Sequence, residues 1–455
     1  MQRFNILLAV GSVLMLAACS NDTAPTVAPS LTGVASATVA ATASPTASTA
    51  SGEAILYDRV NGWEPVMATD PSAPYVYAAS TQKDRRCAKT KTCPNWNISF
   101  RRSDDGGVTW GDPHWICACR DLRWAFDPQL RSDANGNLYA AFLVGPGYDV
   151  RFTRSGDHGE TWSDPVGLMP SDAKWVDHPW LAVSPDGKDV YVAYSSTTRN
   201  WITASHDSGR TWATPVVLER QADGYHYFES GTVAPDGTAY FFAAAYPALS
   251  TGKPLTGLVM SSSDRGKSWT QSEVASAPPP PAPLCKHCAK GQYGMLGGIA
   301  SDANGDLVVA YNGRDPGAAE GEQVWIITSS DRGDSWSDPR AISPPGNVIA
   351  AFPAMAGTGE GDFRAFWTDD RNGADTQTNW NVYVSASSDG GATWSEGRDI
   401  SDGSGRDYQT PEGFDYFYGD YGDVQITSEG KTAAIWGEGF SYDGPGTTWI
   451  WVGGP

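Results

Sequence analysis

The sequence predicts an all-β fold, a seven-bladed β-propeller of four-stranded antiparallel blades closed by its N-terminal strand. Three observations support this prediction: a signature of eight residues recurs, hairpin patterns lie between its copies, and the last repeat lacks one strand. The signature reads Ser-x-Asp-x-Gly-x-Thr/Ser-Trp, and its copies are Ser103–Trp110, Ser155–Trp162, Ser205–Trp212, Ser262–Trp269, Ser329–Trp336 and Ser387–Trp394. Successive copies start 52, 50, 57, 67 and 58 residues apart, a spacing typical of propellers and solenoids.

The chemistry of the signature is that of a tight turn between two strands. Its Ser and Asp side chains can bond nearby backbone amides, and its Gly supplies a left-handed conformation. The terminal Trp has a large apolar face that can close the turn. The signature resembles the Asp box (BNR repeat) of the sialidase-like β-propellers, over essentially the whole chain beyond its N-terminal segment. In that superfamily the box is structural, which implies that the six box Asp residues are not catalytic.

The strand pattern is clearest in the third repeat. Alternating β-branched and aromatic residues bounded by tight turns are hairpin signals. Four short strands in a repeat of about fifty residues make one propeller blade. We expect these strands at His178–Ser184, Val190–Tyr194, Asn200–Ser205 and Thr214–Leu218.

The two ends of the chain fix the number of blades. Three strands are predicted after the sixth signature, at Tyr421–Ile426, Thr432–Trp436 and Thr448–Val452, and a single strand, Ala54–Val60, precedes the first blade. Pairing this strand with the last three completes a seventh blade and removes an exposed sheet edge. The sialidases that the boxes resemble are six-bladed, so the blade number is expected to differ from theirs.

The N-terminal residues predict an exported lipoprotein. A short apolar run, Ile6–Leu16, ends at Leu16-Ala17-Ala18-Cys19, which fits a signal peptide. The pattern resembles a bacterial lipobox and implies removal of residues 1–18, lipid attachment to Cys19, and a place in the outer membrane or at the cell surface. Residues 19–52 are rich in Thr, Ala, Ser and Pro and predict a flexible tether to the propeller at 53–455. An ordinary secretory signal is the alternative.

Composition limits the partners. The formal net charge of −20 argues against nucleic acid. We expect a monomer that binds a glycan, needs no cofactor or metal, and meets a membrane only through its lipid anchor.

The candidate site is predicted at one end of the propeller. Because the Asp box joins the third and fourth strands of a blade, the opposite end carries the loops between strands two and three and the connections between blades. Long loops on a rigid scaffold usually carry function. That end holds the long insertions Thr81–Asn97, Cys117–Asp127, Glu219–Glu229, Ser276–Met295, Thr368–Trp380 and Ser401–Asp420.

Four arginines are candidates for binding a substrate carboxylate there: Arg123, Arg199, Arg314 and Arg371. Guanidinium groups that converge on one pore can hold a carboxylate bidentately. The resemblance to sialidases implies a clamp of Arg123, Arg314 and Arg371, although the Phe/Tyr-Arg-Ile-Pro element around that family's first arginine is absent. Alternatively, Arg314 and Arg371 pair with the Asp residues beside them.

The same resemblance implies a tyrosine nucleophile with a carboxylate partner, and a separate acid. This is the expectation of a glycoside hydrolase acting on an acidic sugar. The candidates are Tyr421, with Tyr416 and Tyr418 as alternatives, Glu412 or Glu438 as its partner, and Asp127 and Asp177 as acids.

Histidine offers a second chemistry. His178 and His226 fall near the mouth of adjacent predicted blades, with Tyr227 and Glu229 close by. A His–Tyr pair with an arginine could neutralise a uronate carboxylate, remove its α-proton and protonate the leaving oxygen, similar to seven-bladed polysaccharide lyases. A non-catalytic propeller that binds a glycan or a protein is the third possibility, since propellers host many functions.

Six cysteines besides Cys19 form three local pairs: Cys87/Cys93, Cys117/Cys119 and Cys285/Cys288. An even count in an exported protein favours disulfides. We expect a local Cys87–Cys93 bridge, with the CxC and CxxC pairs bonded to each other. A zinc site of Cys285, Cys288 and His287 is the alternative.

Overall fold

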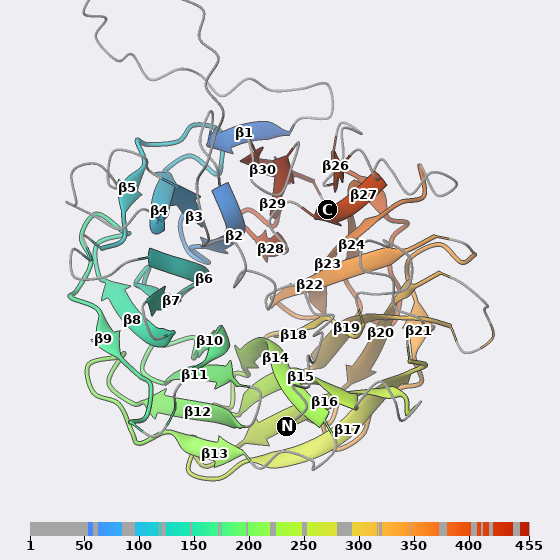
Figure 1. Cartoon of the computed structure of the whole chain (residues 1–455), viewed down its shortest axis with the longest axis horizontal. Coiled ribbons are helices and arrows are strands. Elements are labelled where there is room, and N and C mark those ends of the chain that lie inside the picture. The colour runs from blue at the N-terminus through green and yellow to red at the C-terminus, as the bar shows by residue number, and fades with distance from the viewer. Residues whose placement is uncertain are drawn as a thin grey trace, which may run out of the picture.

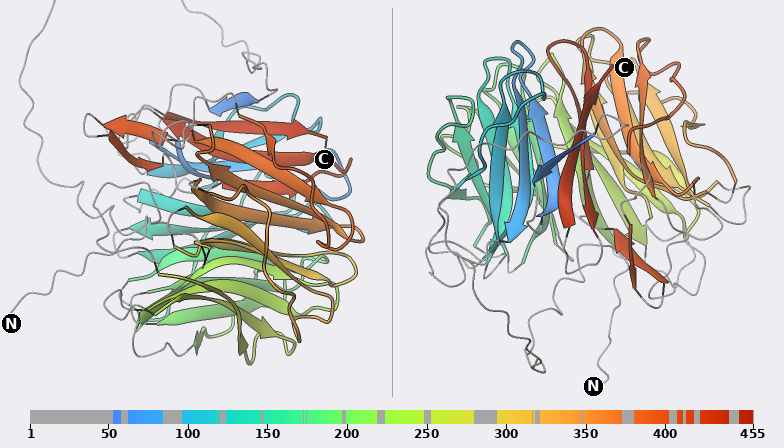
Figure 2. Two further views of the ribbon diagram at one scale, coloured as in Figure 1. Left: turned by 90° about the vertical axis from the view of Figure 1, so that its right-hand side faces the viewer. Right: turned by 90° about the horizontal axis from the view of Figure 1, so that it is seen from above.

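The computed structural model of the chain is a ring of seven four-stranded antiparallel sheets around a central axis (Figures 1 and 2), which confirms the predicted propeller. Among the described residues, no helix is long and apolar enough to cross a membrane. The structure describes residues 53–57, 62–83, 96–117, 119, 124–145, 148–171, 173, 175–196, 199–218, 224–247, 253–279, 294–315, 317, 321–346, 348–372, 380–401, 407–410, 413–417, 422–439 and 446–454.

Blades one to four each run outward from the axis in chain order. Blade one holds β2 (Gly62–Thr69), β3 (Val76–Lys83), β4 (Trp96–Ser103) and β5 (His114–Trp115). Blade two holds β6 (Trp124–Ser132), β7 (Leu138–Gly145), β8 (Asp149–Ser155) and β9 (Val166–Gly167). Blade three holds β10 (Asp177–Val183), β11 (Val190–Ser195), β12 (Asn200–Ser205) and β13 (Val216–Leu218). Blade four holds β14 (Gly224–Val233), β15 (Ala239–Pro247), β16 (Leu255–Ser262) and β17 (Thr270–Ala277).

Blades five and six follow the same order. Blade five holds β18 (Gly297–Ser301), β19 (Leu307–Gly313), β20 (Gln323–Ser329) and β21 (Arg340–Ala341). Blade six holds β22 (Ala350–Thr358), β23 (Asp362–Asp369), β24 (Asn381–Ser387) and β25 (Arg398–Asp399). A separate hairpin of β26 (Asp407–Thr410) and β27 (Gly413–Phe417) precedes blade seven. It lies within the predicted insertion Ser401–Asp420, for which the sequence predicts no strand.

Blade seven is assembled from both ends of the chain. β28 (Gly422–Ile426), β29 (Thr432–Gly439) and β30 (Gly446–Gly453) come from the C-terminus, and β1 (Ala54–Tyr57) is the outermost strand. Ala54 lies opposite Ile450, and Ile55 lies opposite Trp449. The predicted closure by the N-terminal strand is therefore confirmed.

The inner strands β2, β6, β10, β14, β18, β22 and β28 line the axis (Figure 1), and each contacts the next around the ring. Middle strands are buried on both faces, so their sequences read as continuous apolar runs. β11, with the sequence VYVAYS, is buried at every position. The core therefore consists of clusters between neighbouring blades, such as Tyr77 and Phe100 of blade one against Leu138 and Phe142 of blade two.

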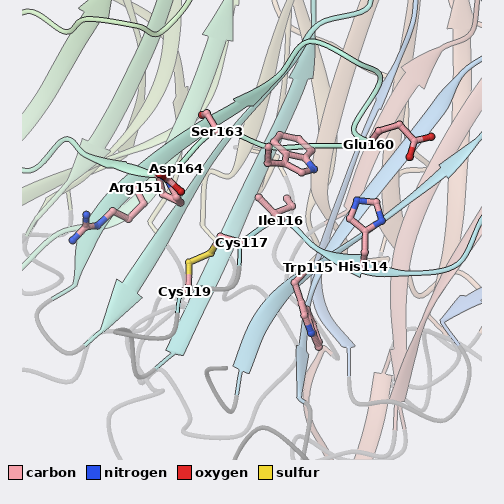
Figure 3. A pocket seen from close by; sticks show the side chains of 11 residues that line it. His114, Trp115, Ile116, Cys117, Cys119, Arg151, Glu160, Ser163 and Asp164 are labelled. Atoms are coloured by element: carbon pink, nitrogen blue, oxygen red, sulfur yellow. A yellow bond between two sulfur atoms is a disulfide. The ribbon is translucent and has the colours of Figure 1, made fainter. Parts of the chain in front are cut away.

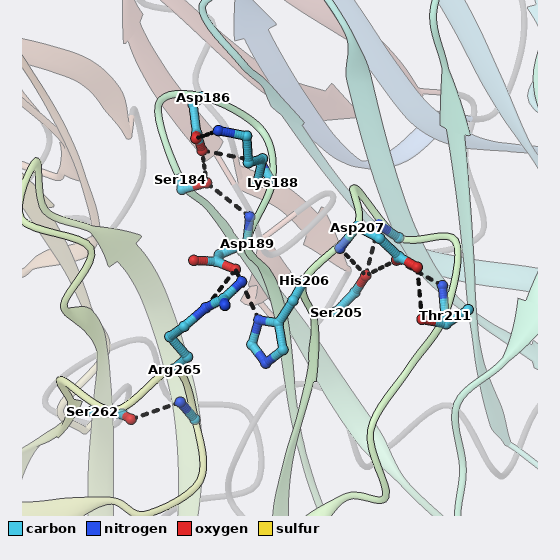
Figure 4. Close-up of polar contacts among 12 residues, drawn as sticks. Ser184, Asp186, Lys188, Asp189, Ser205, His206, Asp207, Thr211, Ser262 and Arg265 are labelled. Atoms are coloured by element: carbon cyan, nitrogen blue, oxygen red, sulfur yellow. Dashed lines mark hydrogen bonds and ion pairs between the residues drawn. The ribbon is translucent and has the colours of Figure 1, made fainter.

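The Asp boxes close the turns between third and fourth strands, as their chemistry predicts. In the third box the Ser205 hydroxyl donates to Asp207 Oδ1 at 2.8 Å, and the Thr211 hydroxyl donates to Oδ2 at 2.7 Å (Figure 4). Gly209 has a φ of +78°, and a Cβ placed on it would lie 2.3 Å from the Phe152 ring. Its conformation and its close approach to the neighbouring blade therefore both require glycine.

The boxes also join neighbouring blades. Asp189 of blade three lies 2.8 Å from Nδ1 of His206 in the third box and 2.6 Å from a guanidinium nitrogen of Arg265 in the fourth box (Figure 4). One carboxylate thus bridges two successive blades. His206 and Arg265 of the boxes thus serve a structural contact between blades.

Replacing Asp207 with alanine is expected to lower the melting temperature by about 2–5 °C at neutral pH. The N–H and the hydroxyl of Thr211 hold the pKa of Asp207 well below its usual range, so its stabilising effect exists above the ordinary carboxyl pKa and is lost as pH falls. The difference between the Asp207→Ala variant and the parent should therefore shrink below about pH 3. Calorimetry at several pH values measures it. Asp338→Asn, at an exposed carboxylate outside the boxes, is the control, and an equal effect of both changes would contradict this account.

Candidate active site at the channel mouth

All inner strands begin at the same end of the channel, which we call the mouth, and the Asp boxes lie at the opposite end. At the mouth, four inner strands carry a residue with positive φ directly before a proline: Glu64, Asp127, His178 and Phe352, with φ of 52°, 50°, 51° and 55°. Such values are uncommon in residues other than glycine, and strained backbone is concentrated at functional sites. A β-bulge accompanies each of them.

This recurring X-Pro pair is a sequence signal that our sequence analysis missed. It occurs as Glu64-Pro65, Asp127-Pro128, His178-Pro179 and Phe352-Pro353, in blades one, two, three and six. Proline removes a ladder donor and is confined in sheets to edges and bulges, so an X-Pro pair near the start of an inner strand predicts the bulge. Blade four has a bulge between Phe228 and Ser230 without proline.

Two of these four residues bond a backbone group in the bulge of the next blade. Glu64 Oε2 accepts the Asp127 N–H at 2.8 Å, from blade one to blade two. His178 Nδ1 lies 3.4 Å from the Phe228 carbonyl oxygen, from blade three to blade four. These contacts join neighbouring inner strands at the mouth, and they fix the orientation of the Glu64 and His178 side chains.

His178 is in edge-to-face contact with Tyr227 of blade four, with ring centroids 5.3 Å apart and an interplanar angle of 66°. Both side chains are buried. Burial lowers the pKa of His178 to about 4, with the Phe228 carbonyl acting in the opposite direction. The imidazole is therefore neutral at pH 7. Since a carbonyl only accepts, Nδ1 carries the proton and Nε2 carries the lone pair.

Glu229, inside the bulge of blade four, is a buried carboxyl group. Burial raises its pKa well above the usual value, and within the described part of the chain no group bonds its Oε1. An uncharged acid at neutral pH is the expected state of such a group. The seam of blades three and four thus joins a neutral imidazole and a phenol, and the same strand β14 carries a carboxyl group that is protonated at neutral pH.

His226 does not share this contact. It precedes Tyr227 on β14, opposite Ala245, and Tyr227 lies opposite Ala244. Successive residues of a strand point to opposite faces, so Tyr227 meets His178 while His226 points away from this pair. His226 is buried as well.

The two candidate acids also lie at the mouth. Asp177 starts β10 and accepts the His178 N–H on Oδ1 at 3.0 Å. The backbone N–H of Asp127 donates to Glu64, as described above. Asp127 and Asp177 are both buried. Glu438, the alternative partner carboxylate, accepts the Trp436 indole N–H at 2.8 Å.

The described arginines lie on separate blades. Arg371 donates to both carboxylate oxygens of Asp369, from Nε at 2.8 Å and Nη2 at 2.5 Å, and its guanidinium lies 3.6 Å from the Tyr383 ring centroid. Arg314 donates to the Pro279 carbonyl at 3.1 Å. Arg199 is exposed just before β12. Arg314 follows the second strand of blade five and Arg371 follows the second strand of blade six. Each of them thus bonds a different partner.

Several candidates lie outside the described residues: Cys19, Arg123, Glu412, Tyr418 and Tyr421, as do the pairs Cys87/Cys93 and Cys285/Cys288. Tyr416 is in β27, but its side chain is not described. Cys117 and Cys119 are bonded to each other. The prediction that this pair bonds to the CxxC pair is therefore wrong, because the two sulfurs already reach one another across a single residue. Among the described residues no group of three or more His, Cys, Asp or Glu side chains is arranged for a metal ion.

Glu322 is expected to make the stability of the fold depend on pH. Its carboxyl group is buried beside Asn312, whose amide donates to Oε2 at 2.9 Å, and burial raises its pKa to about 8. The folded chain therefore holds a proton that the unfolded chain releases above about pH 4.5. Stability should fall as pH rises toward 8 and level off beyond it.

Replacing Glu322 with glutamine is expected to remove this loss, which is worth roughly 3–5 kcal/mol. The measurement is the free energy of unfolding in denaturant at about pH 5, 7 and 9, as the difference between variant and parent. Glu396→Gln, an exposed site, serves as control. A difference that does not change with pH would contradict the assignment.

Comparisons with known proteins agree with the repeat and the fold. Residues 80–253 match the BNR repeat-like domain family, a stretch with three of the six boxes. A comparison with the curated proteins gives no match. Among solved structures, an ulvan lyase described as a new polysaccharide lyase family is 13% identical with a TM-score of 0.54, covering 86% of this chain and 95% of that chain.

Two further structures are similar. A protein of unknown function from Dyadobacter fermentans DSM 18053 is 13% identical with a TM-score of 0.50, covering 88% of this chain and 97% of that chain. The Hadza microbial sialidase Hz136 is 14% identical with a TM-score of 0.47, covering 79% of this chain and 73% of that chain. At these identities the likeness concerns the fold alone.

Proposed function

We propose that this sialidase-like BNR β-propeller is a polysaccharide lyase that cleaves uronate-containing glycans at its channel mouth, with His178 and Tyr227 as the acid–base pair. The observation that carries the proposal is the contact of these two rings across the seam of blades three and four. A neutral imidazole beside a phenol offers a proton acceptor and a proton donor at one place.

The reaction is a β-elimination. His178 Nε2 removes the proton on C5 of the uronate, the electrons of that C–H bond form a double bond between C4 and C5, and the bond from C4 to the glycosidic oxygen breaks. The leaving oxygen takes the proton of the Tyr227 hydroxyl. The buried Glu229, two residues after Tyr227, is expected to be protonated and therefore adds no negative charge to this stretch of β14.

Hydrolysis of an acidic sugar, the alternative, depends mainly on Arg123, Tyr421 and Glu412, outside the described residues. The guanidinium of Arg371 is already held by Asp369. The ulvan lyase supports the elimination reading as a protein of similar fold. We further propose that the chain is an exported lipoprotein anchored through Cys19, with residues 19–52 as a tether to the propeller.

The test uses the chain from Gly52 onward with ulvan, polygalacturonate, alginate and hyaluronan, and in parallel with an aryl α-sialoside. Ultraviolet absorbance of an unsaturated uronate is the expected result. Release of the aryl group without such absorbance would replace the lyase by a hydrolase. If a folded chain gives neither an unsaturated uronate nor a released aryl group, the result would favour a glycan-binding propeller without catalytic activity.

A further inference from the structure

A cavity lies at the outer edge of the propeller, between blades one and two. It has a volume of about 430 Å³ and lies between the outer strand of blade one and the Asp box of blade two. The Cys117–Cys119 disulfide forms part of its wall, with Arg151 and Asp164 nearby, and His114 and Glu160 lie at the other end (Figure 3). Its size is within the range of small-molecule sites.

Two of the charged or polar lining groups have partners within the protein. His114 Nε2 donates to the Gly159 carbonyl at 2.9 Å. Glu160 pairs with Arg102 at 2.8 Å. These contacts fix how the two side chains line the cavity.

Arg151 and Asp164 keep hydrogen-bonding capacity. Asp149 contacts Nε of Arg151 at 2.9 Å, and the arginine side chain is 30% exposed. Within the described part of the chain, no acceptor takes the terminal nitrogens of Arg151, and Asp164 is exposed. A planar guanidinium with both terminal nitrogens available is suited to a carboxylate.

Two half-buried indoles complete the lining. Trp115 comes from β5, and Trp162 is the last residue of the second box. Trp162 packs against Phe100, edge to face with centroids 5.3 Å apart, which fixes its orientation. Sugar rings have an apolar C–H face that stacks on aromatic rings, and their hydroxyls bond carboxylates such as Asp164.

We infer that this rim cavity binds an acidic saccharide, with Arg151 on its carboxylate, Trp115 and Trp162 on its ring face and Asp164 on its hydroxyls. The inference shares the ligand class of the proposed function but none of its residues. A second site on the same polymer would raise affinity for long chains through effective concentration.

The test is a calorimetric titration of the full chain carrying Tyr227→Phe, so that the ligand is not cleaved, with hexamers of galacturonate, alginate and hyaluronan. In this background Arg151→Gln and Trp115→Ala should each weaken binding of at least one hexamer about tenfold or more. The matched control is Arg398→Gln, at an exposed arginine whose guanidinium lies 4.9 Å from the Trp451 ring centroid, and it should bind like the parent.

Melting temperatures of all variants show that the fold is kept. The inference would be overturned if neither Arg151→Gln nor Trp115→Ala changed binding. It would also be overturned if the Tyr227→Phe chain without further changes bound none of the hexamers. A chain that binds through the rim but produces no unsaturated uronate would keep the rim site and reject the lyase. The opposite pair of results would keep the lyase and reject the rim site.

Discussion

Replacing Tyr227 with phenylalanine is expected to lower kcat on a uronate polysaccharide by about 100- to 10,000-fold, the range that a general acid or base contributes. The change removes one hydroxyl and keeps the ring that packs edge to face on His178 and on Tyr246. KM should change little, because the proton transfer is assigned to the transition state. Initial rates of unsaturated-uronate formation provide the measurement.

Tyr191→Phe is the matched control. This tyrosine is also fully buried on blade three, and no described group bonds its hydroxyl. Its loss should leave kcat unchanged. Equal rates for Tyr227→Phe and the parent would remove Tyr227 from the reaction.

His178 should set the acid limit of activity. Its pKa of about 4 keeps the imidazole unprotonated, and therefore able to accept a proton, throughout the neutral range. The pH profile of kcat/KM should fall only as pH approaches about 4, well below the ordinary histidine pKa of about 6.5. An acid limb near the ordinary value would indicate a different base.

The second large effect concerns the closure of the ring. A chain that begins at Gly62 lacks β1 and is expected to lose about 5 kcal/mol or more, which is comparable to the whole stability of many domains. Leu56 and Tyr57 are buried in a cluster with Met67 and Ile450, and the Tyr57 hydroxyl donates to the Ser99 carbonyl at 3.3 Å. Without β1 this cluster is opened and the edge of β30 is unpaired, which favours aggregation.

The control for this truncation is a chain that begins at Glu53, which keeps β1 and removes only the preceding residues. It should melt with the parent, while the chain from Gly62 should melt far lower or aggregate, as measured by calorimetry and light scattering. A synthetic peptide of residues 53–60 should raise the melting temperature of the shorter chain by strand addition. Equal melting temperatures for the two truncations would contradict closure by β1.

The fold could be predicted because each of the first six repeats contains its own turn signals. The boxes fix the turns between third and fourth strands, and the third repeat has all four strands starting within two residues of their predicted positions. The closing strand followed from counting strands at the two ends. The β26–β27 hairpin was missed because it lies between repeats, and among the described residues the other units have no counterpart of it.

The site was predicted less well, because its geometry depends on bulges. A bulge adds one residue and changes which side chains face a neighbouring strand, and a one-residue change moves a side chain to the other face. His178 and Tyr227 meet across a seam between blades, a contact that spacing along one strand cannot predict. The same alternation places His226 and Tyr227 on opposite faces of β14. In the sequence, His226 looked as suitable as His178 for the pair with Tyr227.

The central claim is elimination at the mouth, and the oxygen balance of the products tests it most directly. The reaction would run in water enriched in heavy oxygen, with mass spectrometry of the oligosaccharides released from the polysaccharide that is cleaved. Elimination predicts unsaturated ends, no solvent oxygen incorporated at cleavage, and loss of these products in the Tyr227→Phe variant. One heavy oxygen at each new reducing end, with saturated products, would establish hydrolysis and contradict the assignment of His178 and Tyr227.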